Sequence, residues 1–226
     1  MKRIFFYTII LTILTNCKQN NNISQINSGV IEYNIQYPKE LADQAISNIL
    51  PEEMKVYFTP NELKFKIKGD LNIFLLEYLS RSQGDSCYTL FKVVNRKLYY
   101  PLRKNEKWFL FEKNPPIKFT VHKDSVVNIA GINCHYVNIT YPTKPGQVIN
   151  AYFTKDIKIN NKLFNSPFKE IDGIPLQFEV QYNKRTYKFI ATKIENSIGN
   201  EKMIIPPDYK LSSRQEIHDL VNSILN

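Results

Sequence analysis

The stretch Val30-Ile31-Glu32-Tyr33-Asn34-Ile35-Gln36-Tyr37 decides the fold class of this chain. Apolar side chains occupy its odd-numbered positions from Ile31 to Tyr37, and polar ones fill the positions between them. Successive side chains of a β-strand point to opposite faces of a sheet, so this alternation predicts a half-buried strand. We expect the folded domain to open at Gly29, immediately before it.

The spacing of the apolar residues changes after this strand and later returns to every second position. From Pro38 to Leu50 apolar residues recur at helical spacing, which predicts a short helix that ends before Pro51. The apolar segment Asn72–Leu79 is ambiguous between strand and helix. Other segments beyond Met54 predict strands: Val56–Phe58, Leu63–Ile67, Tyr88–Val94, Leu98–Leu102, Trp108–Glu112, Phe119–His122, Val126–Ile129, Cys134–Tyr141, Val148–Thr154, Leu176–Tyr182 and Thr186–Glu195.

The end of the chain predicts a final helix. Ser213 and Glu216 have the spacing of a capping box, in which the Ser hydroxyl accepts a hydrogen bond from an exposed amide. The apolar residues Ile217, Leu220, Val221, Ile224 and Leu225 then form one face. This face packs on the sheet or on a partner, and we favour the sheet.

Together these elements predict the fold class. Ten or so antiparallel strands follow one another, with a helix near each end and without βαβ alternation, and 29 aromatic residues (14 Tyr, 14 Phe, 1 Trp) suit a β-rich core. We therefore expect a mainly β or α+β domain over residues 29–226, built on a single strongly curved antiparallel sheet.

The first residues have the layout of a secretory signal peptide. A basic start, Met1-Lys2-Arg3, precedes the uncharged apolar run from Ile4 to Leu14. A helix that spans a bilayer needs about 20 apolar residues, so this run is too short for a permanent span. We expect residues 1–16 to be removed.

Leu14-Thr15-Asn16-Cys17 resembles the lipobox of bacterial lipoproteins. The resemblance implies that the Cys17 sulfur accepts a lipid and anchors the chain, while Asn16 departs from the usual Gly, Ala or Ser. The alternative is a cysteine that ends an ordinary signal peptide or an uncleaved anchor. Residues 17–28 are rich in Asn, Gln and Ser and predict a flexible tether.

The residue after the anchor indicates where the protein resides. Lys18 stands where an Asp would suggest inner-membrane retention, so we expect the outer membrane, facing the periplasm. The formal charge of +9 falls to +7 without Lys2 and Arg3. This excess favours anionic headgroups, lipopolysaccharide or nucleic acid, or else reflects a Lys-rich composition. We favour the interpretation that the positive charge reflects composition, and we expect no nucleic-acid partner because Arg is scarce.

Two cysteines remain after Cys17. Cys87 and Cys134 form an even pair in an exported chain, so a disulfide is expected to be stable if they meet. Their spacing leaves two alternatives open, a disulfide or two buried free thiols.

Four strings in order resemble uncharacterised bacterial lipoproteins related in fold to the LolA-type lipoprotein carriers. The resemblance covers Gly29 to about Leu211 and implies an incomplete barrel whose concave side is plugged by helices and, in the carriers, receives acyl chains. No functional residue set transfers with it. The strings are Gly29-Val30-Ile31-Glu32-Tyr33, Ala130-Gly131-Ile132-Asn133-Cys134, Ala151-Tyr152-Phe153-Thr154-Lys155-Asp156 and Ile171-Asp172-Gly173-Ile174-Pro175-Leu176.

The sequence contains no pattern that predicts catalysis. The histidines His122, His135 and His218 have no metal-ligand spacing, and no phosphate-cradling glycine loop occurs. Adjacency in His122-Lys123-Asp124-Ser125 is not triad geometry. Carboxylates such as Glu170 and Asp172 are interpreted as solvated surface. We therefore expect that the protein is not an enzyme and that it binds no metal and no cofactor.

Lys64, Lys66 and Lys68 alternate with apolar residues and predict a basic ridge on one strand face. The ridge suggests a surface for lipid headgroups or nucleic acid. We favour a plainer interpretation, lysines that guard a sheet edge against aggregation.

Three functions remain at this stage. The first is a carrier or binding module that holds an acyl chain, a lipid or another apolar ligand on the concave face. The second is a structural or assembly subunit of an envelope complex, and the third is an enzyme with an unrecognised site.

Overall fold

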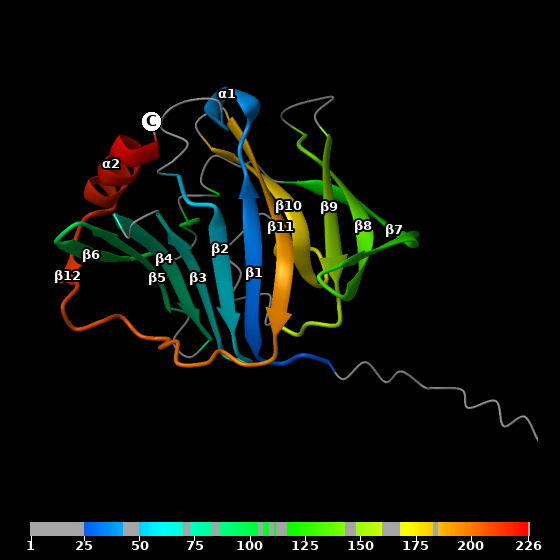
Figure 1. Cartoon of the computed structure of the whole chain (residues 1–226), viewed down its shortest axis with the longest axis horizontal. Helices are drawn as coiled ribbons and strands as arrows, with labels where there is room; N and C mark the ends of the chain where they lie inside the picture. The colour runs from blue at the N-terminus through cyan, green and yellow to red at the C-terminus, as the bar shows by residue number, and fades with distance from the viewer. Residues whose placement is uncertain are drawn as a thin grey trace, which may run out of the picture.

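The computed structural model describes residues 25–42, 50–69, 73–82, 86–103, 106–108, 111, 117–142, 148–159, 168–182 and 185–225. They form one large curved sheet that does not close, with a helix near each end of the chain (Figure 1). The predicted fold class is confirmed. None of the helices described is long and apolar enough to cross a membrane. The predicted signal peptide and Cys17 lie outside the described residues.

The strands follow the predicted alternation closely. The ambiguous apolar segment is a strand, and the helix predicted after Pro38 is described over four residues only, since residues 43–49 lie outside the described part. In chain order the elements are β1 (Gly29–Gln36), α1 (Lys39–Ala42), β2 (Glu53–Phe58), β3 (Glu62–Lys68), β4 (Phe74–Arg81), β5 (Ser86–Val93), β6 (Arg96–Pro101), β7 (Lys118–Ile129), β8 (Ile132–Thr140), β9 (Val148–Thr154), β10 (Ile174–Tyr182), β11 (Arg185–Glu195), β12 (Lys210–Leu211) and α2 (Arg214–Leu225).

Strand β1 lies in the middle of the sheet, between β2 and β11. The order across the sheet is β12-β6-β5-β4-β3-β2-β1-β11-β10-β9-β8-β7. Neighbouring strands are antiparallel except the short β12, which runs parallel to β6. We call strands β2–β6 the clasped arm, because the segment after β11 packs on them, and strands β7–β9 the open arm, because β7 ends the sheet.

The main core lies on the inner face of the curve. Alternate side chains of β1, β3 and β11 are buried there, including Tyr33, Phe65 and Phe189. Helix α2 closes the end of this core beside β6, with Ile217 and Val221 buried (Figure 1). The Ser213 Oγ accepts a hydrogen bond from the Glu216 amide at 3.1 Å, so the predicted cap forms and the helix packs on its own sheet.

A second layer covers part of the outer face of the clasped arm. Residues 196–209, which we call the strap, run from β11 towards β12 (Figure 1). Met203 of the strap is buried against Leu79 and Leu90, with Ile205 and Tyr209 beside it. The main core therefore covers the inner face of the clasped arm, and the strap covers the part of its outer face around Leu79 and Leu90.

The strap changes the meaning of the predicted lysine ridge. Strand β3 lies inside the sheet, so its lysines do not guard an edge, and that interpretation is wrong. Lys64 is only 4% exposed, and its Nζ lies 3.0 Å from Glu77 and 2.7 Å from Glu201. Lys66 contacts the second oxygen of Glu201 at 2.8 Å. Lys64 and Lys66 are thus members of an ion-pair network that includes the buried Glu77.

Three further expectations need correction or refinement. The described residues of the strand predicted at 108–112, Trp108 and Phe111, are not in a strand. The two strands predicted between Phe119 and Ile129 are one strand, β7, whose pairing shifts between His122 and Val126. Ile26 forms an isolated parallel bridge with Ile157, after β9, so the ordered packing begins before the expected domain start.

Candidate functional site

The inner face of the sheet is lined by aromatic rings. Tyr33 comes from β1, Phe65 from β3, Tyr78 from β4, Phe178 from β10 and Phe189 from β11, and all are buried. They meet there because each occupies an inward position in its strand's alternation. Phe178 and Phe189 stack with ring centroids 4.9 Å apart. The result is a wide apolar surface contributed by strands from distant parts of the chain.

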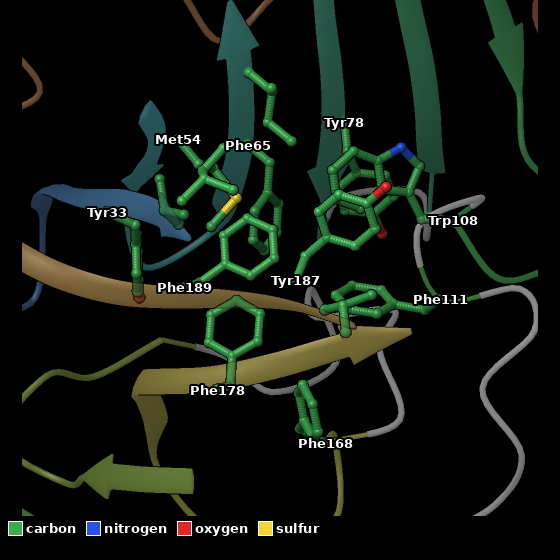
Figure 2. Close-up of a cluster of buried hydrophobic side chains, with 14 of the residues drawn as sticks. Tyr33, Met54, Phe65, Tyr78, Trp108, Phe111, Phe168, Phe178, Tyr187 and Phe189 are labelled. Atoms are coloured by element: carbon green, nitrogen blue, oxygen red, sulfur yellow. The ribbon is translucent and has the colours of Figure 1, made fainter. Parts of the chain in front are cut away.

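Three more rings fill the centre of this surface from outside the sheet. Trp108, Phe111 and Phe168, which we call the aromatic plug, lie in segments between strands and point inward (Figure 2). Each is at most 2% exposed. The inner face is therefore closed by side chains of connecting segments as well as by α2.

The plug bridges strands far apart in the sheet. The Trp108 ring lies 5.3 Å from that of Phe65 and 5.2 Å from that of Tyr78, in the clasped arm. Phe111 connects Trp108, at 5.9 Å, to Phe168, at 6.1 Å. The ring of Phe168 in turn lies near two rings of β9 and β10, Phe153 and Phe178.

Burial keeps the hydroxyls of two tyrosines and one thiol in this interior neutral. The Tyr33 hydroxyl donates a hydrogen bond to the Pro175 carbonyl at 2.8 Å, and burial raises the pKa of Tyr33 well above its ordinary value. Burial likewise raises the pKa of Tyr141 to about 12 and that of the Cys134 thiol to about 12. An uncharged, aromatic interior suits an apolar ligand better than an ionic one.

A small cavity lies beneath α2, with Lys107, the residue before Trp108, in its wall. It holds about 20 Å³ and is lined mostly by apolar surface. That volume accommodates about one water molecule. Its wall includes Tyr100, whose hydroxyl donates to Glu106 at 3.0 Å, and Arg214, which contacts the same carboxylate at 3.2 Å. A larger ligand would have to displace plug side chains or α2.

No protein-family model and no curated protein matches the chain. Among solved structures, the crystal structure of LprF from Mycobacterium bovis is similar to it. The two share 12% sequence identity, the alignment covers 81% of this chain and 91% of that chain, and the TM-score is 0.31. So remote a likeness defines no shared site, and the candidate site rests on geometry.

The two cysteines are free thiols, so the disulfide alternative is not realised in the structure. They lie on strands β5 and β8, in different arms of the sheet. The Tyr78 hydroxyl donates to Cys87 Sγ at 3.2 Å, and Cys134 is fully buried. Cys17, the predicted lipid acceptor, lies outside the described residues.

The other candidate residues are dispersed. His122 stacks on Tyr136, His135 lies 3.1 Å from the Lys123 carbonyl, and His218 bonds Asn222 on α2. Glu170 and Asp172 are exposed, as predicted for solvated surface. In the described part of the chain, no three His, Cys, Asp or Glu side chains lie close enough to hold a metal ion.

Sequence reasoning missed the aromatic plug. The apolar neighbours Phe109, Leu110 and Phe111 favour a strand that includes Trp108. One signal pointed elsewhere, since the preceding residues Lys104 to Lys107 are all polar or charged and do not alternate with apolar ones. The single Trp of the chain thus lies at the centre of the candidate site.

Proposed function

We propose that this protein is a membrane-tethered binding module that holds an apolar ligand, an acyl chain or a lipid, on the inner face of its sheet. The observation that carries the proposal is the aromatic plug. Trp108, Phe111 and Phe168 come from connecting segments, so they can leave the inner face without breaking a strand pair. The site they vacate is lined by Tyr33, Phe178 and other rings.

Burial supports this choice of ligand. An acyl chain gains about 0.8 kcal/mol for each methylene group that it buries, which offsets the loss of plug contacts after several groups. The un-ionised tyrosines of the inner face offer no counter-charge to a deeply bound ion. The polar end of the ligand would therefore remain at the rim.

A fluorescence experiment tests the proposal directly. Trp108 is the only tryptophan of the chain, so its emission reports the plug alone. Residues 18–226 are titrated with a brominated fatty acid, and bromine quenches an indole ring only at close range. We expect saturable quenching by the brominated acid that exceeds any change of emission caused by the unbrominated one, with a raised melting temperature for both.

The control moves the reporter to the outer face. In a Trp108→Phe/Tyr88→Trp variant, the indole occupies a half-buried position beside the strap cluster, away from the plug. Its emission should remain unquenched although the fatty acid still binds. Equal quenching of both reporters, or no saturable quenching of Trp108, would overturn the proposal.

The proposal includes the anchor and the compartment. We propose that Cys17 carries the lipid, that residues 18–24 tether the domain, and that the domain faces the periplasm from the outer membrane. The resemblance of Leu14-Thr15-Asn16-Cys17 to a lipobox supports it. Cys17→Ser should abolish incorporation of a palmitate analogue, and protease added to intact cells should leave the domain uncut.

The edge strand β7 favours a second candidate, an assembly subunit. One side of β7 pairs with β8, and four of its apolar side chains are 38–49% exposed. Such an edge can accept a strand from a partner. Those side chains are Phe119, Val121, Val126 and Val127.

A further inference from the structure

A basic hollow lies on the outer face of the clasped arm, away from the aromatic plug. It has a volume of about 210 Å³ and is lined by Lys66, Lys68 and Lys92 together with Phe74 and Leu75. Leu75 pairs with Lys68 on β3 and with Lys92 on β5. The two lysines therefore stand on either side of Leu75, on backbones about 10 Å apart.

The charges of this arm single out the same two lysines. On strands β2–β6 each other described basic side chain contacts a carboxylate: Lys55 with Glu32, Lys64 with Glu77, Lys66 with Glu201, Arg81 with Glu62, Arg96 with Glu216 and Lys97 with Asp208. Within the described residues, Lys68 and Lys92 have no such contact. Both line the hollow.

One described carboxylate, Asp208, affects the charge balance at Lys92. It lies within electrostatic range of Lys92, but Lys97 bonds its carboxylate directly. Lys66 is similarly held by Glu201, which fixes its position at the rim of the hollow. The hollow thus presents two ammonium groups that no described carboxylate contacts directly and a third that is already oriented.

We propose that this hollow binds a phosphate-bearing anion. A phosphate monoester carries a charge of about −1.5 to −2 at neutral pH and three acceptor oxygens. Lys68 and Lys92 match that charge, and three ammonium groups can each donate to one oxygen. Lysine binds phosphate as a point charge, whereas a carboxylate ligand is better matched by the planar fork of arginine. Leu75 offers an apolar floor to the rest of the ligand.

The experiment separates two sources of the phosphate. The full-length protein in nanodiscs of phosphatidylcholine is titrated with inorganic phosphate, with glycerol phosphate and with soluble short-chain phosphatidic acid, whose headgroup is a phosphate monoester, and binding is measured by microscale thermophoresis. Tightest binding of the phospholipid assigns a lipid headgroup, and equal binding of inorganic phosphate assigns a free phosphate. We expect saturable binding that weakens as NaCl is raised.

Matched variants test the location. Lys68→Gln/Lys92→Gln should weaken binding at least about tenfold, because it removes both charges that no described carboxylate contacts directly. Lys155→Gln/Lys169→Gln removes two positive charges from exposed ion pairs outside this arm and should change binding less than about twofold. An equal loss in both variants, or no saturable binding of any of the three ligands, would overturn the proposal.

Discussion

The two arms of the sheet reach stability by different means. In the clasped arm, the strap covers part of the outer face and α2 lies against the inner face, so one C-terminal segment packs on both sides of β2–β6. In the open arm, the outer face consists of half-buried or exposed side chains of its own strands, such as Tyr136, Asn138 and Asn150, which hydrogen-bond one another. Buried charge is concentrated in the first arm, and exposed apolar surface in the second.

This difference indicates a division of roles. A rigid arm can support a site with fixed charges, such as the hollow beside Leu75, where Glu201 of the strap holds Lys66 in place. An arm with an unpaired edge can open or accept a partner at lower cost. The aromatic plug contacts both, through Trp108 in one arm and Phe168 in the other, so ligand entry is expected to change how they pack together.

The largest expected effect comes from breaking the buried pair of the clasped arm. Lys64→Met leaves Glu77, 3% exposed, without its cation and should destabilise the protein by about 3–5 kcal/mol. Lys64→Met/Glu77→Leu should recover most of that loss, because two apolar groups replace the pair. Urea unfolding measures both. Lys155→Met, which breaks the exposed pair with Asp172, should cost less than about 0.5 kcal/mol. A similar loss of stability in all three variants would contradict the prediction that an unpaired Glu77 is what destabilises Lys64→Met.

The second prediction contrasts two glutamates by pH. Burial acts to raise the pKa of Glu201, but hydrogen bonds from Lys64 and Lys66 outweigh it and hold that pKa below its ordinary value. Its contribution to stability is therefore complete above the unfolded pKa of about 4.3 and lost as pH falls through the folded value. Burial raises the pKa of Glu179 on β10, so ionisation of Glu179 destabilises the fold as pH rises.

The variants should shift stability in opposite directions. Glu201→Gln is expected to cost about 1–3 kcal/mol at pH 7 and to flatten the loss of stability in acid. Glu179→Gln should leave stability unchanged below about pH 4, where Glu179 is protonated in both states, and stabilise the protein at pH 7. Thermal unfolding between pH 3 and pH 8 measures both. If Glu201→Gln left the acid limb as steep as in the wild type, the strap would not depend on this carboxylate.

Much of the sheet was predictable because its information is local. The bounds of β9 were predicted as observed, and the Ser213 cap forms because both of its partners lie within one helical turn. The roles of Lys64 and Lys66 on β3 could not be predicted because Glu201, a carboxylate partner of both, lies 135 residues or more away in sequence. The alternation of apolar and polar residues predicts which face of the sheet a side chain lies on, but not which segment covers that face. It therefore predicts neither the strap nor the aromatic plug.

The third prediction compares one turn in each arm. Val94 after β5 and Ala130 after β7 both have positive φ, 50° and 51°, which costs non-glycine residues about 1 kcal/mol or more. Asn tolerates this conformation, so Val94→Asn and Ala130→Asn should each stabilise the protein by about 1 kcal/mol. The gain at Val94 should be the larger, because its side chain is β-branched. Differential scanning calorimetry resolves shifts of this size, and a loss at either site would show that the native side chain makes a compensating contact.

The smallest expected effect tests whether the edge of the open arm serves binding rather than stability. Val121 on β7 pairs with Val137 on β8, yet they are 41% and 1% exposed. Val121→Thr should change the free energy of unfolding by less than about 0.5 kcal/mol, whereas Val137→Thr buries a hydroxyl and should cost about 1–3 kcal/mol. If β7 accepts a partner strand, Val121→Thr should also reduce the cross-linked complexes recovered from the native envelope while leaving the urea midpoint unchanged. A large destabilisation by Val121→Thr would instead make β7 part of the core, and the distinction between the arms would then reduce to the strap alone.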